Sequence, residues 1–233
     1  MQRNQTLTTL AKGLSIAFAC AGVQAEDFAN TVKVGYAHGG FNTRSGDLSG
    51  PFTPPGIQID LEDMHLLALS YERRLSDPWS FMFQGGTPPR LHFNAAGTAA
   101  GLGPVATARI WFPTVLATYS FTRVPSLRSY VGAGVNYSHF TDEQASSAYT
   151  STVGGTSTSV KMKSSWGPVV RVGVEYPITK NWVVDFSYLR YWIKTTATLT
   201  TATPTPGGHV DVVRTIDAKA NPDVVGLVVG YRF

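Results

Sequence analysis

The stretch YVGAGVNYSHF, residues 130–140, decides the fold. Two alternating sets of side chains share it: Val131, Ala133, Val135 and Tyr137 in one, Gly132, Gly134, Asn136 and Ser138 in the other. Because successive side chains of a β-strand point to opposite faces, one face would be apolar and the other small and polar. A soluble sandwich turns such an apolar face inward, whereas a membrane barrel turns it toward lipid. The stretch therefore predicts a strand, and the rest of the chain decides between the two settings.

The same alternation recurs along the chain and predicts an all-β protein built from eight antiparallel strands. The segments are residues 31–40, 59–75, 79–86, 108–121, 129–140, 165–176, 182–198 and 212–233. Their connections differ in length. Short turns are expected at residues 76–78, 123–127 and 177–181, and long loops at residues 41–58, 87–107, 141–164 and 199–211. Short turns on one side and long loops on the other are typical of an outer-membrane β-barrel.

The N-terminus predicts export. Arg3 and Lys12 precede an apolar run, residues 14–23, and the small residue Ala25 follows. This order is typical of a secretory signal peptide, here residues 1–25 with cleavage after Ala25, and residues 26–233 would form the barrel domain. The apolar run is too short for a membrane-spanning helix, which needs about 20 residues.

Cys20 is the only cysteine and lies inside the predicted leader. The barrel domain would then contain no thiol. Lipid attachment at Cys20 is the alternative, and the bulky Phe18 argues against it, because a lipoprotein signal favours small residues there.

Aromatic residues gather at the predicted strand ends. One girdle lies beside the short turns and the C-terminus and comprises Trp79, Phe81, Tyr119, Phe121, Tyr176, Trp182, Tyr231 and Phe233; Phe112, Tyr137 and Trp192 are expected near the opposite rim. Such rings are typical of membrane interfaces. The expected surroundings are therefore outer-membrane lipid and lipopolysaccharide, and the terminal Phe233 is expected to be read by the barrel assembly machinery. Core aromatics of a soluble β-sandwich are the alternative.

The ordered pieces of this pattern resemble the OmpW family of outer-membrane β-barrel proteins, which includes the AlkL alkane-uptake protein. The matching pieces are VKVGY at 32–36, WFPTVL at 111–116, YSF at 119–121, YVGAGVNY at 130–137, SWG at 165–167, GVEY at 173–176, NP at 221–222 and VGYRF at 229–233. The resemblance covers nearly all of the predicted barrel domain. It implies an eight-stranded barrel with a narrow apolar channel that passes small hydrophobic compounds inward.

Strand alternation, applied independently of the family, predicts two inward-facing sets. Charged residues converge near the short turns: Lys33, Glu72, Arg171, Glu175, Asp185 and Arg232. Nearer the long loops the inward set is apolar: Met64, Leu66, Leu116, Leu189, Tyr191 and Ile193. Charges inside a barrel need partners, so a cross-barrel network is expected to close the periplasmic end. The alternative is that these side chains only fill the interior, as in other small barrels.

These sets favour a channel for small hydrophobic molecules, which would leave sideways into the membrane. Pro113 and Pro168 are the candidate positions for a lateral opening, because each proline removes one hydrogen bond from the ladder. Prolines that only mark strand ends are the alternative. A surface receptor or adhesin that acts through its long loops, and a structural barrel without transport, stay open as well.

Other chemistry finds little support. Ser138 and His139 form the best candidate catalytic pair, but as strand neighbours they would point to opposite faces, so no enzyme is expected beyond the remote alternative of a lipid-modifying one. The histidines have no repeated metal-ligand spacing, and no cofactor is expected. Gly132 and Gly134 lie within a strand and not in a phosphate-binding loop. The net charge of +4 includes Arg3 and Lys12 of the leader, so nucleic-acid binding is not indicated.

Overall fold

Eight strands close into a hydrogen-bonded ring in the computed structural model, which describes residues 29–124 and 127–233. They are β1 (Asn30–Ser45), β3 (Met64–Arg74), β4 (Trp79–Gly86), β7 (Thr114–Val124), β8 (Leu127–Ala145), β10 (Ser165–Pro177), β11 (Trp182–Tyr191) and β13 (Gly208–Arg232). Each pairs antiparallel with the next in this order, and β13 pairs with β1. The predicted eight-stranded barrel is confirmed.

Some sequence-based expectations fall beyond the described residues. The predicted leader, residues 1–25, and residues 125 and 126 of one predicted turn lie outside them. Within the described residues, no helix has the length and apolar character needed to cross a membrane.

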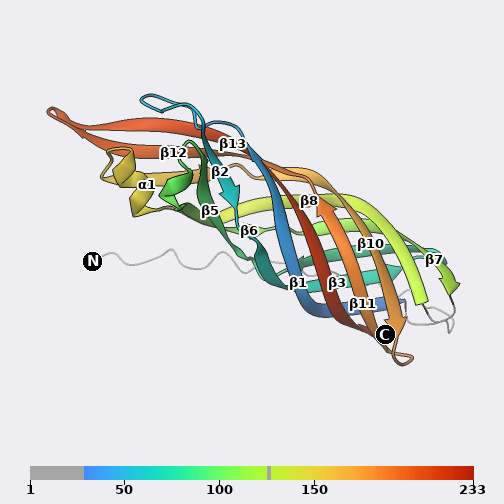
Figure 1. Ribbon diagram of the computed structural model, residues 1–233. Helices are drawn as coiled ribbons and strands as arrows, with labels where there is room; N and C mark the ends of the chain where they lie inside the picture. Colours follow the sequence, from blue (N-terminus) through green and yellow to red (C-terminus); the bar gives the residue numbers. More distant parts are fainter. Residues whose placement is uncertain (1–28, 125–126) are drawn as a thin grey trace, which may run out of the picture.

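Five further strands extend the ring at the long-loop end, where Figure 1 shows β12 and β13 running on side by side beyond the barrel. These strands are β2 (Ile57–Leu61), β5 (Arg90–Gly97), β6 (Pro104–Trp111), β9 (Ser157–Met162) and β12 (Ile193–Thr205). On one side, β6 pairs with β8, β5 pairs with β6, and β2 pairs with β5. On the other side, β12 pairs with the first half of β13, and β9 pairs with β12. Two short helices, η1 (Ala100–Leu102) and α1 (Ser147–Thr152), lie in this extension.

The extension corrects several predicted boundaries. Predicted strands 59–75, 108–121 and 182–198 each divide in two, and the predicted loops 87–107, 141–164 and 199–211 contain strand. The cause is visible in β5, where Leu91, Phe93 and Ala95 are buried while the intervening residues face out. Apolar alternation thus continues past the barrel, with a polar outer face typical of contact with water.

The outward-facing residues of β13 change from apolar to polar at one position along the strand. Its outward residues are Val225, Leu227, Val229 and Tyr231 on the short-turn side and Asp223, Asn221 and Lys219 beyond. Since lipid favours the apolar set and water the polar one, the boundary of the membrane-facing belt falls between Val225 and Asp223.

The predicted girdle beside the short turns faces outward throughout: every one of its eight aromatic residues is exposed. Trp79 packs edge-on against Tyr119, and Trp182 against Tyr231, with ring centroids 5.2 and 5.1 Å apart. At the opposite rim the prediction for Phe112 is wrong. Its ring packs inward against Tyr191, because Phe112 lies between the end of β6 at Trp111 and the start of β7 at Thr114, where the alternation of the strands is interrupted.

Candidate functional site

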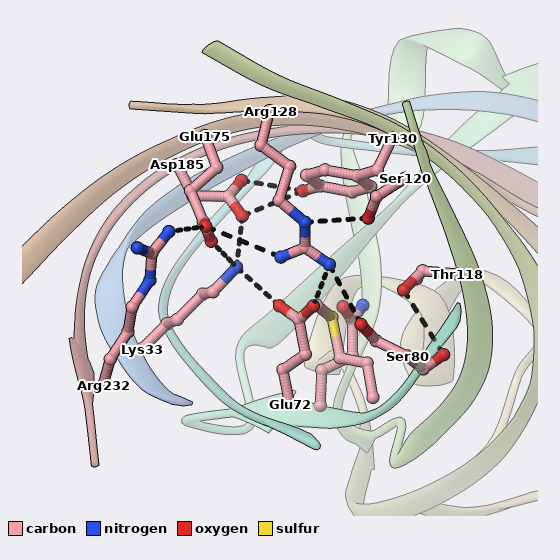
Figure 2. A network of polar contacts seen from close by, with 12 residues as sticks. Lys33, Glu72, Ser80, Thr118, Ser120, Arg128, Tyr130, Glu175, Asp185 and Arg232 are labelled. Atoms are coloured by element: carbon pink, nitrogen blue, oxygen red, sulfur yellow. Dashed lines mark hydrogen bonds and ion pairs between the residues drawn. The ribbon is translucent and has the colours of Figure 1, made fainter. Parts of the chain in front are cut away.

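Lys33 occupies the centre of a charged network inside the short-turn end of the barrel (Figure 2). Its Nζ atom lies 2.9 Å from Glu72 Oε2, 2.7 Å from Glu175 Oε2 and 2.6 Å from Asp185 Oδ2. The side chain is fully buried. Strands β1, β3, β10 and β11 supply these four residues, since alternation turns each of them inward. An ammonium group with three carboxylate partners has its buried charge compensated.

Arg128 is a member of this network that the sequence prediction missed. Its Nη2 atom donates to Glu72 Oε1 at 2.7 Å and to Ser80 Oγ at 2.9 Å, and its Nη1 lies 3.5 Å from Glu175 Oε1. The predicted strand began at Ser129 and the predicted turn ended at Leu127, so Arg128 was assigned to neither. The signal was nevertheless present, because Arg128 has the same parity as the inward residues Gly132 and Asn136.

Arg171 lies one layer further from the short turns. Its Nε donates to Tyr130 Oη at 2.9 Å, its Nη1 donates to Gln84 Oε1, and its Nη2 lies 3.4 Å from Asp185 Oδ1. Tyr130 in turn donates to Asp185 Oδ1 at 2.8 Å. The sequence analysis also missed Tyr130 and Gln84, which connect Arg171 to the rest of the network.

Arg232, near the end of β13, donates to Glu175 Oε1. All six residues of the predicted charged set therefore lie together, joined by Arg128. The network contains four bases (Lys33, Arg128, Arg171 and Arg232) and three acids (Glu72, Glu175 and Asp185). Side chains from β1, β3, β8, β10, β11 and β13 meet across the lumen, and these seven residues are called the floor.

A cavity of about 40 Å³ lies directly on the floor, and Arg171 belongs to its lining. Three residues of the predicted apolar set, Leu66, Leu189 and Tyr191, border it. The other three, Met64, Leu116 and Ile193, are buried inward-facing residues that do not border it. We call this space the lower cavity.

The lower cavity reaches the barrel wall between β4 and β7. Gly85 and Phe112 are both part of its lining. Strand pairing here stops at Gln84 and Thr114, and backbone contact resumes where Ile110 N donates to Pro89 O. Pro113, one of the two predicted opening positions, lies in this interval and has no N–H to donate. No atom lies within 4 Å of the position that a Cβ on Gly85 would occupy.

Pro168, the other predicted position, lies within β10 and faces outward. The wall is bonded around it: Pro168 pairs with Val135 of β8, and its carbonyl accepts a hydrogen bond from Trp192 N at 3.2 Å. Of the two prolines, Pro113 is the one beside the cavity.

A second cavity, of about 90 Å³, lies in the extension and is called the upper cavity. Its lining is almost wholly apolar and comes from β2, β5, β6, β9, β12, β13 and α1, with Leu48, Ile57, Phe93, Leu199 and Ile216 among the residues. The cavity was missed because β5, β9 and α1 lie wholly in predicted loops, so the predicted strands had no second wall to enclose a space.

The candidate catalytic pair does not form. Ser138 is fully buried and accepts a hydrogen bond from Asn136 Nδ2 at 2.8 Å, whereas His139 faces outward and contacts Ser164 Oγ. Within residues 29–124 and 127–233, no group of three or more His, Cys, Asp or Glu side chains is placed to hold a metal ion.

Comparison with known proteins gives a consistent result. The sequence model of the OmpW family matches residues 21–233. Outer membrane protein W of Vibrio cholerae is 31% identical over 169 residues, which span 72% of this chain and 73% of that protein. The dibenzothiophene metabolism operon protein PahQ of Pseudomonas aeruginosa is 25% identical over 74% of this chain and 77% of its own length.

Solved structures agree on the fold. The crystal structure of the outer membrane protein OprG from Pseudomonas aeruginosa superposes with a TM-score of 0.76 at 22% identity, over 89% of this chain and 96% of that one. The solid-state NMR structure of outer membrane protein AlkL in lipid bilayers gives a TM-score of 0.58 at 17% identity, over 100% of this chain and 97% of that one.

Proposed function

This chain belongs to the OmpW family of outer-membrane β-barrel proteins, and on that premise we propose that it is a channel for the uptake of small hydrophobic molecules. The observation that carries the proposal is the lower cavity, an apolar space with an ion-paired floor. A solute that enters from the long-loop, extracellular end meets apolar walls first and a closed layer of charge after them.

The lining favours apolar solutes on energetic grounds. The larger polar groups that border the lower cavity are already engaged: Gln84 Nε2 donates to Tyr191 Oη at 2.7 Å, and Arg171 binds Gln84 and Tyr130. The lining otherwise offers the hydroxyls of Ser70 and Ser187. A polar solute would therefore lose most of its hydration and gain few partners in return, at a cost of roughly several kcal/mol. An apolar solute has no such penalty.

The exit we propose is lateral, through the interval between β4 and β7. The floor blocks the direct route to the periplasm, whereas at Gly85 and Pro113 the wall lacks strand pairing and has open space outside it. The outer surface at this level faces lipid, into which an apolar solute partitions favourably. One relative is named for a dibenzothiophene metabolism operon, and dibenzothiophene is an apolar aromatic compound, which agrees with this substrate class.

The test is to fill the proposed exit. A Gly85→Phe variant places a ring where a Cβ meets no atom within 4 Å, so the barrel should still assemble. We expect cells with this variant to take up toluene several-fold more slowly than cells with the unchanged protein, while xylose uptake stays the same. Gly207→Phe is the matched control, because Gly207 also has open space around it but lies in the turn between β12 and β13.

Equal toluene uptake by cells with and without the unchanged protein would contradict the channel itself. If Gly207→Phe reduced toluene uptake as much as Gly85→Phe, the proposed position of the exit between β4 and β7 would be contradicted. A receptor or adhesin remains the second candidate function, and the observation that favours it is the hairpin of β12 and β13, which projects beyond the barrel (Figure 1). That function predicts that deleting the hairpin tip, residues 203–210, abolishes surface binding and leaves toluene uptake unchanged.

A further inference from the structure

Arg214 is a buried cation without an anionic partner. It faces inward on the part of β13 that belongs to the extension, and only 3% of its surface is exposed. Its Nε donates to Thr53 Oγ1 at 3.1 Å, but its Nη1 has no hydrogen-bond partner, and among the described residues no carboxylate lies within ion-pair distance of it. The floor shows the contrast, since every base there lies within ion-pair distance of a carboxylate.

The surrounding backbone holds Arg214 in place. Ser49 and Thr215 bond to each other in both directions, N to O at 2.9 Å, which fixes the loop of residues 46–56 against β13. Gly50 then lies so close that a Cβ there would come within 2.9 Å of Arg214 Cγ. The loop of residues 46–56 therefore covers the Arg214 side chain, and the guanidinium is not free to move out to solvent.

A second unsatisfied donor lies beside it. Tyr149 in α1 is 6% exposed, and its Oη has no hydrogen-bond partner among the described residues. Burial raises the pKa of the Tyr149 hydroxyl and the nearby Arg214 guanidinium lowers it, so the hydroxyl keeps its proton at neutral pH. Tyr149 is positioned by the N-cap of α1, where its backbone N donates to Ser146 Oγ at 3.0 Å.

Tyr149 lines the upper cavity, and Arg214, which is not part of the lining, lies next to residues that are. These residues are Ile216, the next inward residue after Arg214, and Leu199, the ladder partner of Arg214 on β12. One end of an otherwise apolar space therefore has two buried donors, a guanidinium N–H and a phenol O–H. A carboxylate accepts from both at once, and charge-assisted hydrogen bonds of this kind are the strong ones.

We propose that the upper cavity binds small carboxylates with an apolar tail, the carboxylate on Arg214 and Tyr149 and the tail among Leu48, Leu199 and Ile216. This inference goes beyond the proposed function, because a charged carboxylate held in the upper cavity is disfavoured in the apolar lower cavity. An anion at Arg214 compensates a charge whose burial otherwise costs free energy.

Three probes separate the two parts of the site. Benzoate has both carboxylate and ring, benzamide has the ring without the charge, and acetate has the charge without the ring. In titration calorimetry on the protein in lipid nanodiscs, with empty nanodiscs as the blank, we expect benzoate to bind at least tenfold more tightly than either of the others. Arg214→Met should remove this preference, and Tyr149→Phe should weaken benzoate binding several-fold with little effect on benzamide.

A structural readout accompanies the binding assay. Arg214→Met removes an uncompensated charge, so the ligand-free variant should melt at a higher temperature than the unchanged protein. Lys161→Gln is the control for charge, because Lys161 is exposed on β9 of the extension and should affect neither benzoate binding nor melting. If benzamide binds as tightly as benzoate and Arg214→Met changes neither, the inference is wrong while the apolar channel stands. If none of the probes binds and toluene uptake is also absent, both the inference and the proposed function are wrong.

Discussion

Arg128 reaches across the barrel to Glu72, with 2.7 Å between Nη2 and Oε1, although their strands, β8 and β3, are not neighbours in the ring. Lys33 of β1 likewise binds Glu175 of β10 and Asp185 of β11, and neither of those strands neighbours β1. Backbone pairing joins only adjacent strands, so these side chains add the connections between strands that are not adjacent. We therefore expect the floor to contribute both to the stability of the closed ring and to its impermeability.

Replacing Arg128 should destabilise the barrel strongly. Arg128→Met leaves Glu72 without one of its two cationic partners in a buried setting, and breaking such a pair costs about 3–5 kcal/mol. The measurement is urea unfolding in lipid vesicles, followed by the heat-dependent shift in gel mobility. The control is Arg109→Met, which breaks an exposed pair with Asp142 and should cost at most about 1 kcal/mol. Similar losses for both variants would show that the floor is not energetically coupled.

Opening the floor should raise ion conductance. Arg171→Ala combined with Arg232→Ala removes two large side chains and leaves Glu175 and Asp185 with fewer partners. We expect larger single-channel conductance in planar bilayers together with a lower melting temperature. Arg109→Ala serves as the control, since Arg109 lies on the extension. Conductance and melting that both match the unchanged protein would mean that these side chains do not close the lumen.

The sequence predicted the floor because the alternation rule needs only the parity of each residue within a strand. Lys33, Glu175 and Asp185 all lie within both the predicted segments and the observed strands, so small errors at the strand ends left their faces correctly assigned. Arg128 was missed for the opposite reason: it lies at a strand end, where the predicted boundary excluded it.

The extension could not be predicted in the same way. Its strands have outer faces of Thr, Ser, Lys and Asp and inner faces that include alanines, so the contrast that marks membrane strands is absent. Only β5, with Leu91 and Phe93, had a strong apolar signal. Arg214 was missed because its segment looked like any polar strand, and its burial depends on the loop that covers it, a tertiary contact that alternation does not reveal.

One glycine of the deciding stretch should be indispensable. A Cβ on Gly134 would lie 1.8 Å from Val115 O and 2.8 Å from Leu116 Cα, both backbone atoms of the neighbouring strand. Gly134→Val should therefore prevent the pairing of β7 with β8 and reduce the heat-modifiable, assembled fraction in outer-membrane preparations to near zero. Gly85→Val is the control, with open space at its Cβ, and should assemble normally. Normal assembly of both variants would contradict the close approach of the strands.

Three bases stand in a row across the outer face just beyond the membrane-facing belt. Lys219 of β13 is the ladder partner of Arg44 on β1 and of Lys194 on β12, and all three are exposed. Among the described residues, none of the three lies within ion-pair distance of a carboxylate. Like charges directly opposite each other on neighbouring strands destabilise a sheet, by roughly 0.2–1 kcal/mol for each pair. Trp192, an exposed residue two positions before Lys194, marks the level of the lipid headgroups.

This row should bind the phosphate groups of lipopolysaccharide, because anions placed against it remove the repulsion among the three bases. We expect the protein to melt at a higher temperature in vesicles that contain bisphosphorylated lipid A than in vesicles that contain the dephosphorylated form. The triple variant Arg44→Gln, Lys194→Gln, Lys219→Gln should lose most of that difference, whereas Arg73→Gln, Arg74→Gln, Lys180→Gln, which removes the same charge near the short turns, should retain it. High salt should reduce the difference for the unchanged protein, since screening weakens exposed charge interactions. Equal melting temperatures in both kinds of vesicle would leave the row without a phosphate partner, and a difference that persists in the triple variant would place the lipid A contact elsewhere on the barrel.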